Sequence, residues 1–152
     1  MATTTASLTI TSSDLVGDAL SLSASKQLHK AGTTTGLDQI TGLTHLTLTA
    51  TTQLDIFPVL PASPAGQNKQ SWVYICNKAT DETHYITVSI AATDIGRLYA
   101  GDFMWMPWNR SARFVDLSLT PSVATGMTID YGMFYESLEH LASTDARTFT
   151  NE

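Results

Sequence analysis

Histidine and acidic side chains are the residue types best suited to proton transfer, and the 152-residue chain has one local combination of them. Asp81 and Glu82 precede His84, so an acid and a base could lie beside an imidazole. The same residues belong to the segment NKATDE and its continuation, between two stretches of strand character, where Asp commonly forms the turn itself. We therefore interpret this cluster as turn chemistry and expect no catalytic role for it.

Metal-binding and thiol chemistry find equally little support in the sequence. His29, His45, His84 and His140 are far apart and lack the paired spacing of common metal sites, so we expect surface or interstrand polar roles and no metal. Cys76 is the single cysteine, which rules out an internal disulfide or a cysteine-based zinc site built from this chain. We expect a buried, inert thiol there.

Other catalytic signatures are missing from the sequence. No serine lies in a Gly-x-Ser-x-Gly elbow, and there is no Gly-rich phosphate loop or dinucleotide fingerprint. Gly32, Gly36 and Gly42 are irregularly spaced among threonines, which is typical of turns. We therefore expect neither an enzyme nor a bound cofactor.

The charge balance argues against nucleic acid and membrane partners. The net charge is −6 and the eight basic residues are scattered, whereas phosphate binding needs clustered Lys and Arg. No apolar run approaches the roughly 20 residues that cross a bilayer, and the first residues lack the pattern of a signal peptide. We expect no export by that route, and a polar surface with few charges, since charged residues make up 14% of the chain.

Short alternating segments dominate the second half of the chain. They are rich in β-branched and aromatic residues and are separated by Gly, Pro and Asn, which predicts strands joined by turns. The predicted strands span residues 71–76, 83–90, 102–106, 112–119 and 127–134. A short connection is expected between the second strand, 83–90, and the third, 102–106.

The first half of the chain predicts further strands, joined by loops. Residues 1–13 carry no charged side chain and predict a first strand or an extended arm, and residues 19–23 alternate Leu with Ser like a half-buried strand. Residues 31–42 predict a loop or a pair of turns. Residues 43–49 predict another strand, which residues 54–57 extend or pair with.

These elements predict one all-β domain, an antiparallel β-sandwich of jelly-roll type with a Thr/Ser-rich N-terminal arm. With 43% hydrophobic residues the chain is long enough to bury one core. We expect an arm or first strand at 1–17, the sandwich at 18–142 and a polar tail at 143–152. Within the sandwich, the proline-rich stretch 58–68 predicts a long crossover loop, and residues 135–141 predict a turn or two of helix.

The most apolar stretch is FMWMPW, residues 103–108. As a strand it directs Phe103 and Trp105 to one face and Met104 and Met106 to the other, so both faces meet apolar surroundings. One interpretation is a central core strand that ends at Pro107. The other is a subunit interface, with a corner at Trp108 and its neighbours. The interface hypothesis comprises Leu8, Ile10, Phe103, Trp105, Pro107, Trp108 and Arg110.

The succession of strands and turns resembles that of small β-rich structural proteins of tailed bacteriophages, most closely capsid decoration or cement proteins. The resemblance lies in WVYICNKATDETHYITVSI, LYAGDFMWMPW, ARFVDLSL and IDYGMFYES, and in the Thr/Ser-rich start SLTITSSDLVGDALSLSASKQLHKAGTTTGLDQ. It implies a homo-oligomer, expected to be a trimer, that is synthesised in the host cytoplasm and binds the major capsid protein on the outer surface of the virion. The uncharged N-terminal segment would serve as its arm.

Two alternatives remain open. The same physics would serve a neck, tail or baseplate protein, for which a ring of six or more copies is expected. A carbohydrate-binding module is the other, because sugar rings pack on exposed aromatic planes. The aromatic residues considered for such a face are Trp72, Tyr74, Tyr85, Tyr99, Trp105, Trp108, Tyr131 and Tyr135.

Overall fold

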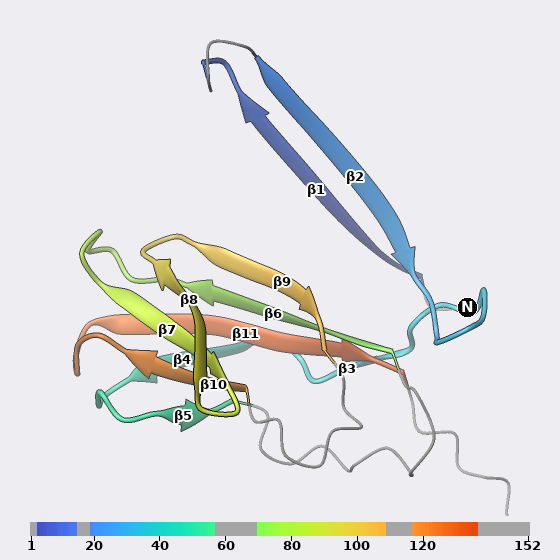
Figure 1. Ribbon diagram of the computed structural model, residues 1–152. Coiled ribbons are helices and arrows are strands. Elements are labelled where there is room, and N and C mark those ends of the chain that lie inside the picture. Colours follow the sequence, from blue (N-terminus) through green and yellow to red (C-terminus); the bar gives the residue numbers. More distant parts are fainter. Residues whose placement is uncertain (1–2, 15–18, 57–69, 109–116, 137–152) are drawn as a thin grey trace, which may run out of the picture.

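The computed structural model describes residues 3–14, 19–56, 70–108 and 117–136, and every regular element within these ranges is a β-strand (Figure 1). The strands pair antiparallel throughout, which confirms the predicted all-β class. The strands are β1 (Thr4–Ser12), β2 (Leu20–Leu28), β3 (Gln39–Ile40), β4 (Thr44–Leu48), β5 (Leu54–Asp55), β6 (Ser71–Asn77), β7 (Tyr85–Ile90), β8 (Thr93–Tyr99), β9 (Phe103–Pro107), β10 (Leu117–Pro121) and β11 (Met127–Tyr135).

Two sheets share one hydrophobic core. The first has the order β5-β10-β7-β8, and the second has the order β3-β11-β6-β9, with β4 also paired to β11. Side chains alternate along each strand, so Val73 and Ile75 of β6 are fully buried, as are Ile86 of β7 and Ile129 of β11. Each such side chain contributes roughly 1.5–3 kcal/mol on burial, and these residues belong to one cluster that spans both sheets.

Buried Asn77 ties the end of β6 to the other sheet. Its side chain is fully buried, and its amide group donates to the carbonyl oxygens of Leu98 at 3.0 Å and His84 at 3.4 Å. Its side-chain oxygen accepts the amide of Ala79 at 2.9 Å. A polar side chain satisfied in this way joins three backbone segments inside an otherwise apolar region.

Most predicted strands of the second half are present. The predictions at 71–76 and 127–134 are confirmed within one residue, while 83–90 is strand from Tyr85 onward and 102–106 from Phe103 onward. The prediction at 112–119 is strand from Leu117, and residues 112–116 lie outside the described ranges.

The predicted connection between β7 and β9 is wrong because it contains β8. Ala91 and Ala92 form a two-residue turn with φ of 48° and 62°, a backbone that Asn and Gly usually adopt. Asp94 and Gly96 are weak strand formers, and a register shift at Val88/Ser89 interrupts the pairing. None of these residues gives the usual hairpin signal.

Strand β9 is an edge strand, so the prediction of a central core strand is wrong. It lies at the end of the sheet order and pairs with β6, where Tyr74 faces Trp105. Its end at Pro107 is confirmed, since proline has no amide to donate to a ladder. The predicted division of its side chains is also found: Met104 and Met106 pack against the core, and Phe103 on the other face is 59% exposed.

The first two strands form a hairpin that projects from the two sheets (Figure 1). They pair over nine residue pairs, from Thr4↔Leu28 to Ser12↔Leu20. We call β1 and β2 together the arm. The predicted boundary at 17/18 falls between its two strands, and the predicted strand at 19–23 is the beginning of β2.

Residues 39–48 run along β11 with one interruption. Strand β3 lies within the predicted loop 31–42, and β4 confirms the predicted strand at 43–49. The prediction that 54–57 extends or pairs with 43–49 is wrong, because β5 pairs with β10. The predicted crossover loop at 58–68, the predicted helical turn beyond residue 136 and the tail at 143–152 lie outside the described residues.

Candidate interaction site

Five aromatic side chains lie together on the outer side of the second sheet. The register places Trp72 beside Phe134 and Pro107, and Tyr74 beside Trp105, all on the face opposite the core. We call this surface the aromatic face; it consists of Trp72, Tyr74, Phe103, Trp105 and Phe134.

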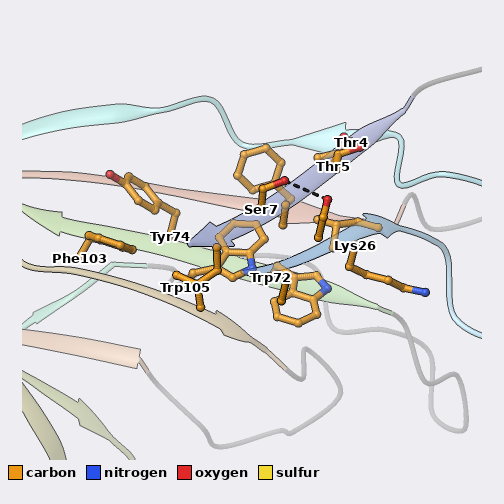
Figure 2. Close-up of a pocket in the computed structure, with 14 residues that line it drawn as sticks. Thr4, Thr5, Ser7, Lys26, Trp72, Tyr74, Phe103 and Trp105 are labelled. Carbon is orange, nitrogen blue, oxygen red and sulfur yellow. Dashed lines mark hydrogen bonds between the residues drawn. The ribbon is translucent and has the colours of Figure 1, made fainter. Parts of the chain in front are cut away.

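Ring contacts hold the aromatic face together. The rings of Trp72 and Trp105 are stacked, with centroids 5.4 Å apart and planes 9° from parallel. Phe134 meets Trp105 edge to face at the same centroid distance and an angle of 67°. Such pairs contribute roughly 0.5–1.5 kcal/mol beyond burial, so the contacts hold the two tryptophan rings in a parallel stack. Phe103, two residues before Trp105 on β9, lies on the same side of the sheet (Figure 2).

The arm has one apolar and one polar face. Because side chains alternate, the register gathers its aliphatic residues on one side and Ser and Thr on the other. On the polar face the hydroxyls of Ser7 and Ser25 are hydrogen-bonded at 3.0 Å. The apolar face carries one charged side chain, Lys26. Its aliphatic members are Ala6, Leu8, Ile10, Leu20, Leu22, Ala24 and Leu28.

A cleft of about 600 Å³ separates the base of the arm from the aromatic face (Figure 2). At this base Leu28 is 2% exposed and Thr4 and Ala6 are half-buried, whereas Thr5 and Ser7 are exposed. The apolar face of the arm therefore turns toward the aromatic face. Apolar rings form one wall of the cleft, and the arm adds both aliphatic side chains and polar ones to the other wall. The cleft is therefore suited to a largely apolar partner that also makes a few polar contacts. The polar arm residues that line it are Thr4, Thr5, Ser7, Ser25 and Lys26.

The base of the arm is fixed to the sheets by a compact loop. Leu37 is 2% exposed, like Leu28, and its amide donates to the carbonyl oxygen of Leu28 at 3.0 Å. Lys30 and Asp38 form an ion pair at 2.8 Å. The buried carboxylate of Glu136 accepts the amide of Ala31 at 3.0 Å. These contacts set the direction in which the arm leaves the sheets.

Tyr74 is an ionisable group of the aromatic face whose pKa is shifted, and Cys76 lies beside it. The pKa of Tyr74 is raised, first by its partial burial and then by the neighbouring Cys76 thiol and Asp130 carboxylate. Its hydroxyl is therefore neutral and can donate a hydrogen bond at neutral pH. Cys76 is 7% exposed, which confirms the predicted buried thiol.

The structure brings together part of the predicted interface. Leu8, Phe103 and Trp105 line the same cleft, and Ile10 follows Leu8 on the same face of the arm. Trp108 does not join them, because it packs against the core.

The remaining members of that hypothesis fall at the margin or beyond it. Pro107 is exposed and pairs with Trp72 at the end of β9, while Arg110 lies outside the described residues. The interface hypothesis omitted Trp72, Tyr74 and Phe134. The alternation of β6, which puts Trp72 and Tyr74 on the same side, was the signal for two of them.

Asp81 and His45 make hydrogen bonds that hold a turn and a strand pair. Asp81 accepts the amide and hydroxyl of Thr83 at 2.9 and 2.6 Å, as expected of a turn residue. His45 pairs across strands with Asp130, Nδ1 to Oδ1, at 2.5 Å, which confirms an interstrand polar role. Within the described ranges, no three His, Cys, Asp or Glu side chains gather closely enough to hold a metal ion. His140 lies outside those ranges.

The fold and the cleft define an all-β protein with a largely apolar cleft between its arm and its second sheet. None of its described segments is a helix long and apolar enough to span a membrane. No protein-family model, curated protein or solved structure matches the chain.

Proposed function

We propose that this chain is a structural virion protein, a capsid decoration (cement) protein that assembles into a homo-oligomer and binds the major capsid protein on the outer surface of the head. The observation that supports the assembly is the projecting arm with its exposed apolar face. The resemblance of the strands to phage decoration proteins supports the setting. The two sheets that share a core fit a β-sandwich body, for which we propose a jelly-roll type.

The arm needs a partner surface to be stable. An isolated two-stranded hairpin is at best marginally stable in water. On the apolar face Leu8, Ile10 and Leu20 are each 43% exposed and Leu22 is 48% exposed. Covering what remains exposed of each would contribute roughly 1 kcal/mol, or about 3–4 kcal/mol for each copy. Monomers rarely expose a contiguous apolar strip of this kind unless it is an interaction site.

Low charge on this surface supports assembly with like surfaces. The apolar face carries Lys26 as its charged residue, and the opposite face consists of Ser, Thr and Gln27. Little charge must be desolvated when such a face is covered, so burial is not opposed by a large electrostatic cost. Many identical weak contacts to a repeating shell then add by multivalency. No cofactor, nucleic acid or membrane takes part in this mechanism.

The solution mass of the purified chain tests the proposal. We expect an oligomer of three copies, each of 16.4 kDa, by light scattering coupled to size exclusion, and binding of that oligomer to shells that lack a decoration protein. Leu22→Asp on the apolar face should abolish assembly, while Ser23→Asp on the polar face should not. A ring of six or more copies would favour a neck, tail or baseplate protein. A monomer that binds no shell would contradict the proposal.

A carbohydrate-binding module is the second candidate, because the cleft exposes aromatic planes. Phe103 is 59% exposed at the edge of the stacked Trp72–Trp105 pair, and Tyr74 and Lys26 offer hydrogen-bond donors beside it. We expect Phe103→Ala to lose any glycan binding. Tyr99→Ala is the matched control, since Tyr99 is a 41% exposed aromatic residue on β8 of the other sheet. Absence of binding across a broad glycan array would remove this candidate.

A further inference from the structure

We infer that the apolar face of the arm of one copy docks on the aromatic face of a neighbouring copy. This inference rests on the self-assembly proposed above and names the two surfaces that meet. The occupant of the cleft is thus a second copy of the same chain, whose arm covers the plane of Trp72 and Trp105 and the exposed ring of Phe103.

The arm diverges from its own aromatic face. The two surfaces approach at the base, where Leu28 is 2% exposed, and separate toward the tip, where Ile10 is 43% and Leu22 is 48% exposed (Figure 1). The hydrogen bond from Ala31 to Glu136 and the burial of Leu28 fix the exit of the arm. The outer half of the arm therefore has no apolar cover within the described residues of its own chain.

A second copy satisfies both surfaces at once. Within the described residues, each chain carries one arm whose outer half is uncovered and one aromatic face that is partly exposed. Copies that exchange arms cover both surfaces in equal numbers. An unrelated partner on one surface would leave the other exposed to water. Aromatic side chains are enriched at the centres of protein interfaces, and Ser and Thr on the opposite face of the arm remain in solvent.

The area that one arm buries on one aromatic face determines how many such contacts a stable assembly needs. Strands of nine residues in a two-stranded ribbon give a face of roughly 30 Å by 10 Å, or about 300 Å². One arm on one aromatic face therefore buries about 600 Å² in total, less than the roughly 1,200–2,000 Å² of a specific interface. A reciprocal pair of copies makes two such contacts in one interface, about 1,200 Å² at most, whereas a closed ring of three holds about 600 Å² at each of its three interfaces. The contact is therefore sufficient only where a closed assembly repeats it.

Disulfide trapping between two different chains tests this contact. Full-length chain with Ile10→Cys is mixed with a longer tagged chain with Phe103→Cys and oxidised with oxidised glutathione. The native Cys76 stays in both chains because it is buried, and wild-type chain measures its background. Thr9→Cys, on the polar face of the same strand, is the matched control. We expect about tenfold more mixed disulfide from Ile10→Cys than from Thr9→Cys, because a disulfide needs Cα atoms within about 7 Å.

A second cysteine position on the arm keeps the test decisive if Ile10→Cys does not fold. Leu22 lies opposite Ile10 on the same face, so Leu22→Cys should trap Phe103→Cys of the other chain, and its control is Ser23→Cys. Equal trapping from both faces of the arm would overturn the inference. So would a disulfide that forms within a chain carrying both Ile10→Cys and Phe103→Cys at high dilution, while the mixture forms none. That result would mean that the arm closes on its own sheet.

Light scattering on the same samples separates this inference from the proposed function. An intact oligomer without mixed disulfide would overturn arm docking and leave the assembly protein standing. A monomer that binds no shell would overturn both. A trapped pair in an oligomer that binds no shell would support arm docking and contradict the decoration role.

Discussion

The buried carboxylate of Glu136 accepts a hydrogen bond from the backbone amide of Ala31 at 3.0 Å, between residues 105 apart in the sequence. The same oxygen accepts the amide of Gln70 at 3.1 Å, and Glu136 is 5% exposed. One side chain after the end of β11 therefore joins the exit of the arm to the start of β6. The direction of the arm depends on this contact.

Removing the Glu136 carboxylate should destabilise the protein and loosen the arm. Glu136→Ala leaves two amide donors without this acceptor, so we expect a loss of about 2–4 kcal/mol in the free energy of unfolding, measured by urea denaturation. Glu136→Gln keeps an acceptor oxygen and should lose about half as much. Hydrogen exchange at the Ala31 amide should accelerate in Glu136→Ala. Unchanged exchange there would show that the bond does not fix the arm.

Gly132 of β11 leaves room for the backbone at Gly42, which passes close to it. A Cβ at this position would lie 2.9 Å from the carbonyl oxygen of Gly42, in the interruption between β3 and β4. Thr41 holds that interruption in place, since its hydroxyl accepts the Met133 amide and its amide donates to the Met133 carbonyl, both at 2.9 Å. We expect Gly132→Ala to cost about 1–3 kcal/mol in thermal or urea unfolding.

Gly96 provides the matched control for Gly132. It also lies in a strand, but a Cβ there meets nothing within 4 Å. Because glycine weakens a strand interior by roughly 0.5–1 kcal/mol, Gly96→Ala should be neutral or slightly stabilising. A similar loss at both positions would mean that the Gly42 carbonyl is not the cause.

Composition and alternation predicted the all-β class and most of the second-half strands. These signals are local: β-branched and aromatic residues between turn residues identify a strand wherever it pairs. Pairing is not local, so the sequence did not show that β5 joins β10 or that β9 lies at an edge. Strand β8 was missed because its turn, Ala91–Ala92, carries no turn residue.

The candidate site was partly predictable for the same reason. Alternation placed Phe103 and Trp105 on one side of the strand, and the structure confirms this, with Phe103 exposed and Trp105 half-buried. Residues 1–13 predicted a first strand or an extended arm, and residues 19–23 predicted a half-buried strand. That these two strands pair with each other and stand above the aromatic face depends on contacts between distant residues, such as Glu136 with Ala31.

The turn between β7 and β8 stores backbone strain that glycine and asparagine should relieve. Ala91 and Ala92 have φ of 48° and 62°, and a non-glycine residue in this region costs about 1 kcal/mol. We therefore expect Ala92→Gly to raise the free energy of unfolding by about 1 kcal/mol, and Ala91→Asn with Ala92→Gly to raise it further. Ala124→Gly is the control, since Ala124 is an exposed turn residue without positive φ. An equal gain at Ala124 would contradict the strain.

The turn at Asp81 predicts a measurable pKa change. Hydrogen bonds from the hydroxyl of Thr83, and then from its amide, hold the pKa of the Asp81 carboxyl below its ordinary value of 3.8. Because the folded pKa is lowered, the stability from this contact is fully present above pH 3.8 and is lost as the pH falls through the lowered value. Thr83→Val keeps the amide and removes the hydroxyl, so the Asp81 pKa should rise toward 3.8 in an NMR titration. Thr80→Val, a nearby exposed substitution, should leave it unchanged; equal shifts in both variants would assign the effect to the loop as a whole and not to the Thr83 hydroxyl.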